Sequence, residues 1–181
     1  AEAGCEIIRC AVPDDEAALA LRDIVAESPI PVVADIHFSP KLAMMALEAG
    51  IHKLRLNPGN IRNKDKTREI VREARDRGVP IRIGINAGSL DKTYLMRDGW
   101  PSPQGMVDSA RGHIELLEDL DFRDIVVSLK ATDSPRAHEA YCMLAELCDY
   151  PFHLGITEAG HGTDAVIKSS VGLGSLLIKG I

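Results

Sequence analysis

The chain has 181 residues, 45% of them hydrophobic, and a formal net charge of −6 at pH 7. This content can bury one sizeable core, whereas the acidic balance argues against a general nucleic-acid or membrane-surface binder, because both need a basic face. No apolar run approaches the about 20 residues of a bilayer span and no signal-peptide pattern opens the chain, which predicts a soluble, cytoplasmic protein.

Six strand-like runs alternate with six amphipathic helical patterns. We expect strands near 6–12, 31–37, 52–57, 80–86, 124–130 and 151–157, and helices near 14–27, 39–49, 65–77, 103–119, 135–148 and 163–179. Asp14, Ser39 and Asp133 stand at helix starts as capping residues, and glycines follow several predicted helix ends. The stretch from Ala87 to about Ser102 predicts an extended loop. Strict alternation of short aliphatic strands with helices is typical of parallel βα units.

Both ends of the chain resemble interior parts of a longer repeat. AEAGCEIIRC at the start aligns without gaps on LEAGIHKLRL at 47–56, where a helix tail leads into a strand. LLIKGI at the end stops where a glycine cap precedes a further strand. We therefore predict an α/β fold, a partial (β/α)8 TIM-type barrel forming one domain over 1–181, with about six βα units visible and the first and last ones missing. An open doubly wound sheet is the alternative.

Along each predicted strand, the side chains at every second position are polar, and those between them are mostly aliphatic. The aliphatic side must meet the covering helices, so the polar side chains should face the barrel interior. There, five cations oppose one clear acid, Asp35, and because burying unpaired charge is costly, we expect an anionic ligand. The polar positions are Arg9, Asp35, His37, Lys53, Arg55, Asn57, Arg82, Asn86, Ser128, Lys130, His153 and Thr157.

An internal network in which Asp35 and acids of the loops neutralise the cations is the alternative to a ligand, above all for Arg9 and Lys53. Turn chemistry explains Asn57 and Asn86 almost as well as ligand contact does, because both end their strands. The four cysteines show no metal-ligand spacing, which favours structural thiols.

Three glycine-containing loops follow predicted strands and strengthen the ligand interpretation. They are Asn57-Pro58-Gly59-Asn60, Asn86-Ala87-Gly88-Ser89 and Glu158-Ala159-Gly160-His161-Gly162. Glycine permits close backbone approach, and a helix start after the last loop can bind phosphate through its N–H groups. Together with the cations, these loops favour a phosphorylated small molecule.

Several segments carry a family resemblance. VADIHF at 33–38, LRLNPGNI at 54–61, IRIGINAGSL at 81–90, SLKATD at 128–133 and HLGITEAG at 153–160 resemble the barrel of 4-hydroxy-3-methylbut-2-enyl diphosphate synthases, in the family's order. The resemblance implies an iron–sulfur oxidoreductase of the non-mevalonate isoprenoid pathway. Its substrate would be 2-C-methyl-D-erythritol 2,4-cyclodiphosphate, which it opens reductively.

The resemblance also implies a 4Fe–4S cluster held by three cysteines and a glutamate in a C-terminal domain beyond the barrel. The cysteines of this chain do not match that motif, so we expect no cofactor bound to these residues and no activity from them alone. The implied partners are ferredoxin or flavodoxin as electron donor and a second copy in a homodimer, with no nucleic acid and no membrane.

Residue roles follow as hypotheses. We expect Arg55, Arg82, Asn86 and Lys130 to bind the diphosphate, with hydrogen bonds from Ser89 and Asn57. Asp35 and His37 would orient the substrate, and Glu158, beside Thr157 at a strand tip, would protonate the departing hydroxyl. A non-redox barrel enzyme acting on a phosphorylated or pterin-like molecule is one alternative, and a binding or assembly module is another.

Overall fold

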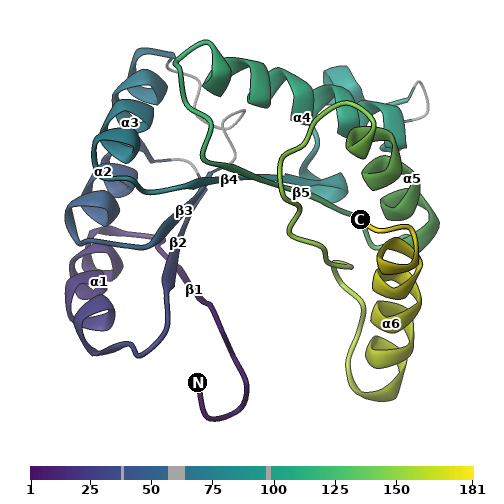
Figure 1. Ribbon diagram of the computed structural model, residues 1–181, viewed down its shortest axis with the longest axis horizontal. Helices are drawn as coiled ribbons and strands as arrows, with labels where there is room; N and C mark the ends of the chain where they lie inside the picture. Colours follow the sequence, from purple (N-terminus) through teal and green to yellow (C-terminus); the bar gives the residue numbers. More distant parts are fainter. Residues whose placement is uncertain (38, 57–63, 97–98) are drawn as a thin grey trace. The chain divides into compact units, whose positions relative to one another are not determined.

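A computed structural model of the chain describes residues 1–37, 39–56, 64–96 and 99–181. Five strands alternate with helices, in the strand order β1-β2-β3-β4-β5, and the registers of β1 to β4 are parallel (Figure 1). The predicted α/β class is therefore confirmed. The strands are β1 (Ile8–Ala11), β2 (Val32–Ile36), β3 (Lys53–Leu56), β4 (Ile81–Asn86) and β5 (Ile125–Lys130), and the helices are α1 (Asp15–Glu27), α2 (Pro40–Glu48), α3 (Lys64–Asp76), α4 (Pro103–Glu118), α5 (Ser134–Ala145) and α6 (Gly162–Ile178).

The chain divides into two compact units. The first comprises Ala1–Ile83 with Leu116–Ile125, and the second comprises Gly84–Glu115 with Val126–Ile181.

In the first unit, α1, α2 and α3 lie along one side of β1, β2 and β3 (Figure 1). The aliphatic strand residues Ala34, Leu54 and Ile81 are completely buried, as are Leu47 of α2 and Ile70 of α3. This burial stabilises the unit, since apolar side chains gain about 1.5–3 kcal/mol each when removed from water. The aliphatic parity of the strands thus faces the helices, as predicted.

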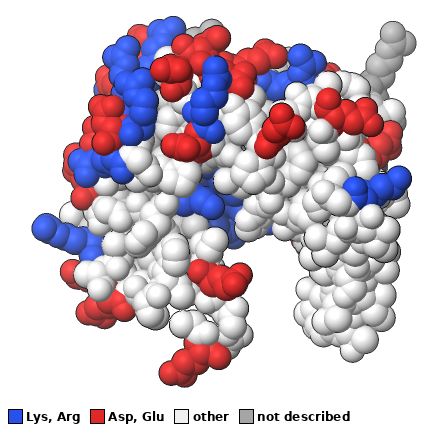
Figure 2. Space-filling model, viewed as in Figure 1, with Lys and Arg blue, Asp and Glu red and all other residues white. Residues whose placement is uncertain are grey.

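The outer surface of α3 carries both signs of charge (Figure 2). Ion pairs join Lys66 to Glu69 and Arg68 to Asp65, three residues apart, and Arg77 just beyond the helix to Glu73, four residues back. Such exposed pairs contribute only tenths of a kcal/mol, so α3 owes its position to its buried apolar face.

Helix boundaries follow the predicted capping chemistry. The side chains of Asp14, Ser39 and Asp133 accept hydrogen bonds from backbone N–H groups in the first turns of α1, α2 and α5. Gly50 and Gly78 follow α2 and α3 with φ angles of 83° and 65°, a conformation that glycine adopts without a steric penalty.

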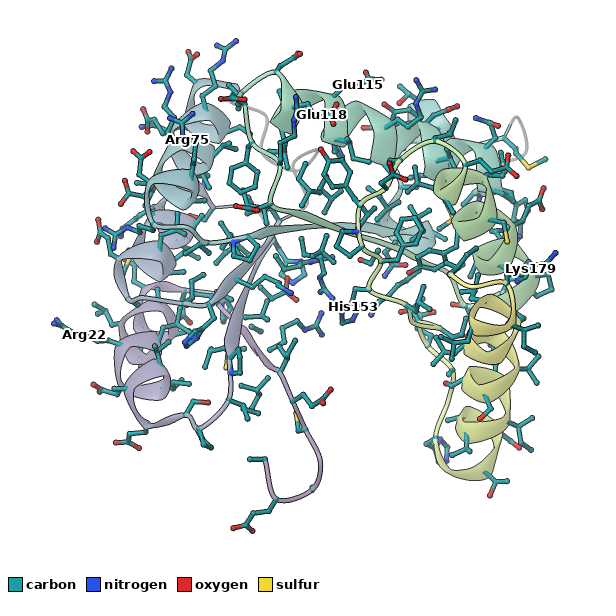
Figure 3. The ribbon with its side chains drawn as sticks, in the orientation of Figure 1. Arg22, Arg75, Glu115, Glu118, His153 and Lys179 are labelled. Atoms are coloured by element: carbon teal, nitrogen blue, oxygen red, sulfur yellow. The ribbon has the colours of Figure 1, made fainter. Side chains whose placement is uncertain are left out.

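In the second unit, the strand predicted over 151–157 is wrong: this segment forms only an isolated bridge, between Phe152 and Val127 of β5. The His153 N–H still donates to the Val127 carbonyl at 2.8 Å. In a regular ladder the Leu129 N–H would next donate to the His153 carbonyl. Here the Tyr141 hydroxyl of α5 lies between these two groups: it accepts from the Leu129 N–H at 3.0 Å and donates to the His153 carbonyl at 2.9 Å. A buried side chain therefore interrupts the pairing, and His153 marks this segment in Figure 3.

The predicted loop from Ala87 to Ser102 contains two short 3-10 helices, Ala87–Ser89 and Lys92–Tyr94, and an antiparallel bridge between Leu95 and Pro101. α4 packs closely on it, because a Cβ at Gly105 would lie 2.0 Å from the Tyr94 carbonyl oxygen. None of the helices in the described ranges is long and apolar enough to traverse a lipid bilayer.

His113 of α4 makes stability depend on pH. Burial lowers the pKa of His113 from 6.5 to about 4, because the charged imidazolium is disfavoured there. Between these two values the unfolded chain binds a proton that the folded chain does not. We expect the free energy of unfolding to fall as the pH is lowered through this range, by about 1.4 kcal/mol per pH unit from this group. In urea titrations repeated at several pH values, the free energy of unfolding of His113→Gln should depend less steeply on pH. The control His161→Gln changes an exposed histidine, and it should keep the pH dependence of the unmodified protein.

Candidate functional site

A row of charged side chains crosses the first unit. Residues Ala11, Asp35, Arg55 and Arg82 are register partners on β1, β2, β3 and β4. Register partners of parallel strands project to the same face of the sheet. Asp35 is 3% exposed and Arg82 is 5% exposed. The prediction that Arg82 projects to the face opposite the helices, with Asp35 and Arg55, is confirmed within this unit.

Asp35 is the centre of this row. Its Oδ1 accepts a hydrogen bond from Arg55 Nη1 at 2.7 Å, and its Oδ2 lies 3.1 Å from Arg9 Nη1. His37 adds its Nε2 at 3.7 Å from Oδ1, while its Nδ1 lies 3.4 Å from Arg55 Nη1. One carboxylate thus serves two guanidinium groups and holds Arg55 against β2.

The internal network expected as the alternative to a ligand is therefore present for Arg9 and Arg55. It does not balance the charge of these two side chains, because the guanidinium groups of Arg9 and Arg55 share the single carboxylate of Asp35. Within the described residues, the buried Nε of Arg55 has no hydrogen-bond partner. A buried donor of this kind costs free energy until an acceptor reaches it, so the row suits an oxyanion.

In the second unit, Glu158 follows the segment that runs beside β5. The Thr157 N–H donates to the Ala131 carbonyl at 3.2 Å, which ties this segment to the end of β5. The Thr132 hydroxyl then donates to Glu158 Oε2 at 3.0 Å. Glu158 has a φ of 52°, which is uncommon for a residue other than glycine. The exposed carboxylate is thus held in one place by its neighbours at some backbone cost.

Lys130, at the end of β5, lies across Gly155. A Cβ at position 155 would be 2.9 Å from both Cε and Nζ of Lys130, so the end of the lysine side chain would have to shift to make room for it. Gly155 therefore leaves the space through which the lysine extends. Sequence reasoning assigned no role to Gly155 or to Thr132, although both belong to segments that carry the family resemblance.

Asn86 and Ser89 form a turn after β4. Asn86 Oδ1 accepts from the Gly88 N–H at 3.2 Å, and the Ser89 hydroxyl donates to the Asn86 carbonyl at 3.4 Å. The turn hydrogen bond expected of Asn86 is thus present. Asn57 lies outside the described residues. A cavity of about 350 Å³ adjoins this turn and is lined by Ala87, Gly88, Leu90, Leu95, Gly99, Trp100, Pro101, Thr132 and Arg136.

The described residues contain no group of three or more His, Cys, Asp or Glu side chains that could hold a metal ion. The cysteines are all outside disulfides, and they do not form a common cluster. These thiols therefore do not fit an iron–sulfur centre.

Comparison with known proteins now identifies the family. The model of the GcpE TIM-barrel domain matches residues 1–181. The chain belongs to this family. A relative from Geobacter sulfurreducens, named 4-hydroxy-3-methylbut-2-en-1-yl diphosphate synthase (flavodoxin), is 58% identical over 181 residues, which are 100% of this chain and 51% of the relative. A Bacillus subtilis protein of the same name is 54% identical over 100% of this chain and 48% of its own length. The chain thus spans about half the length of these relatives.

Solved structures agree on the fold. The dihydropteroate synthase of Stenotrophomonas maltophilia matches with a TM-score of 0.71 and 14% identity, over 98% of this chain and 74% of that one. The Yersinia pestis dihydropteroate synthase matches with a TM-score of 0.69 and 12% identity, over 99% and 74%. At such identities the likeness concerns the fold alone, and with the GcpE match it confirms the TIM-barrel class.

The Asp35 network generates a stability prediction. Asp35→Asn keeps the side-chain shape but leaves the Arg55 guanidinium buried without its counter-charge, so we expect a loss of about 3 kcal/mol in the free energy of unfolding. The matched control is Arg9→Gln, which removes the other partner of the same carboxylate. The Arg9 side chain is 55% exposed, so this loss should stay below about 1 kcal/mol. Equal losses in urea titrations of the two variants would contradict this account.

Proposed function

We propose that this chain is the substrate-binding barrel of a 4-hydroxy-3-methylbut-2-enyl diphosphate synthase, an oxidoreductase of the non-mevalonate isoprenoid pathway. Its substrate is 2-C-methyl-D-erythritol 2,4-cyclodiphosphate, which is opened reductively to the linear diphosphate. The observation that carries the proposal is the 58% identity to a synthase along the whole of this chain. The excess of guanidinium groups around Asp35 supports it, because the substrate is a diphosphate.

The cationic side chains bind the diphosphate. Arg55 and Arg82 offer planar N–H groups, which match phosphate oxygens in pairs, and Lys130 offers a point charge. Asn86, Ser89 and Asn57 add hydrogen bonds. Asp35 keeps Arg55 in position before the ligand arrives, so less side-chain freedom is lost on binding.

The remaining polar groups act on the rest of the substrate. Asp35 and His37 orient its hydroxyl and ring, together with Thr157. Glu158 is the general acid: its carboxyl proton passes to the departing hydroxyl, which leaves as water. The Thr132 hydrogen bond to one carboxylate oxygen supports this role, since it fixes the direction of the acid.

The electrons come from outside these 181 residues. In this proposal a 4Fe–4S cluster, bound by a C-terminal domain that follows the single barrel domain, supplies them, and flavodoxin is the donor, as in the names of the relatives. The complete enzyme is a cytoplasmic homodimer. Because the thiols of this chain do not fit such a cluster, we derive no redox step from its residues.

Arg82→Ala tests the anion site. In the complete enzyme we expect KM for the cyclic diphosphate to rise by about tenfold or more, or turnover to vanish, because a charge-assisted phosphate contact is lost. Arg22→Ala is the matched control, since Arg22 is exposed on α1 and points away from the strands (Figure 3). Near-normal kinetics of the Arg82 variant would refute the assignment.

Glu158→Gln tests the acid separately. The amide keeps the shape and the contact with Thr132 but carries no acidic proton, so turnover should drop by about 100-fold or more. Substrate affinity, measured by calorimetry, should remain within about twofold, because no group that binds the diphosphate has changed. Unchanged turnover would rule out the acid role even if the substrate assignment holds.

A further inference from the structure

The contact between α5 and α6 contains a chain of three reactive groups. His138 and Cys142 lie four residues apart on α5, which places them on the same face of that helix. Ser175 comes from α6, which lies beside α5 (Figure 1). The distance from Cys142 Sγ to His138 Nε2 is 3.5 Å, and that from His138 Nδ1 to Ser175 Oγ is 2.9 Å.

The hydrogen bonds determine which nitrogen of His138 carries the proton. The Ser175 hydroxyl has one hydrogen, and it donates this hydrogen to the Gly172 carbonyl at 2.9 Å. The serine oxygen must therefore accept from His138, so the neutral imidazole has its hydrogen on Nδ1. Nε2 then presents a lone pair to Cys142, and the thiol donates to it. This is the order nucleophile, base and orienting group that activates cysteines.

Tight packing holds the chain in place. A Cβ at Gly172 would lie 2.5 Å from Cδ1 of Ile156 and 3.2 Å from the Ser134 hydroxyl. At this glycine, α6 therefore packs closely against side chains of α5 and of the 151–157 segment. The residues Cys142, His138 and Ser175 are all partly exposed.

We propose that Cys142 is a modifiable thiol, activated by His138, that reacts with peroxides and soft electrophiles. The thiol proton passes to His138 Nε2, and the thiolate attacks one oxygen of hydrogen peroxide. An S–O bond forms as the O–O bond breaks, and the departing hydroxide takes the proton from the imidazolium to give water. The sulfur is oxidised to a sulfenic acid while the peroxide is reduced. Ser175 acts as a positioning residue that orients the imidazole.

Cys5 is an internal reference in the same molecule. Cys5 is exposed, and its thiol donates to the Ile7 carbonyl at 3.2 Å. A carbonyl oxygen accepts this hydrogen bond but is too weak a base to remove the proton from the thiol. If exposure alone set the reactivity, Cys5 would react faster than the partly exposed Cys142. If the base sets it, the order is reversed.

The test is the rate of alkylation by iodoacetamide, followed for each cysteine by peptide mass spectrometry. We expect Cys142 to react about tenfold faster or more than Cys5 at neutral pH. His138→Gln should bring the Cys142 rate down to that of Cys5 or below, and Ser175→Ala should lower it by a smaller factor. Neither change should alter the Cys5 rate. With hydrogen peroxide, dimedone should label Cys142, and Cys142→Ser should abolish that label.

A Cys142 rate below that of Cys5 in the unmodified protein would overturn the proposal. So would an unchanged Cys142 rate in His138→Gln with a native circular dichroism spectrum. Should that variant unfold, Ser175→Ala decides, because the serine contributes only the orienting hydrogen bond: an unchanged rate in a folded Ser175→Ala protein also contradicts the mechanism.

Discussion

The carboxylate of Asp35 is the constraint on which the polar face of the first unit depends. It is almost completely buried, and it accepts from Arg55 at 2.7 Å while also pairing with Arg9. Without it, a sheet that is apolar toward its helices would hold guanidinium groups with no counter-charge, at a cost of several kcal/mol. With it, Arg55 is fixed in place, and two guanidinium groups still share one carboxylate. The same pair thus stabilises this face of the sheet and holds Arg55 at the anion site that we propose.

The second unit relies on hydrogen bonds from side chains where backbone pairing stops. Tyr141 enters the ladder between β5 and the 151–157 segment, and Thr132 fixes the carboxylate of Glu158 just beyond it. Lys130 extends across Gly155 of the same segment, where a Cβ would meet the end of the lysine side chain. Contacts at the end of β5 and in the 151–157 segment therefore position the carboxylate of Glu158 and the ammonium group of Lys130.

The family of this chain is known from its relatives, whereas the chemistry of its site has to be inferred from its own residues. The GcpE match covers all 181 residues, and the relatives bear the name of one enzyme, yet the chain spans about half of their length. The residues of this chain supply guanidinium groups, the carboxylate that positions Arg55, and a candidate acid in Glu158. Its thiols do not fit an iron–sulfur cluster. One of those thiols, Cys142, instead lies in a hydrogen-bonded chain with His138 and Ser175.

The sequence by itself determined the alternation of strands and helices, the caps at Asp14 and Ser39, and the face to which Arg82 projects, because these follow from local periodicity and local hydrogen bonds. Only the tertiary structure decided which cations share Asp35, since partner choice depends on register between strands. It also decided that Tyr141 interrupts the sixth predicted strand, a contact that no period of two or 3.6 residues encodes. The pairing of His138 with Ser175, 37 residues away, likewise arises only when two helices pack.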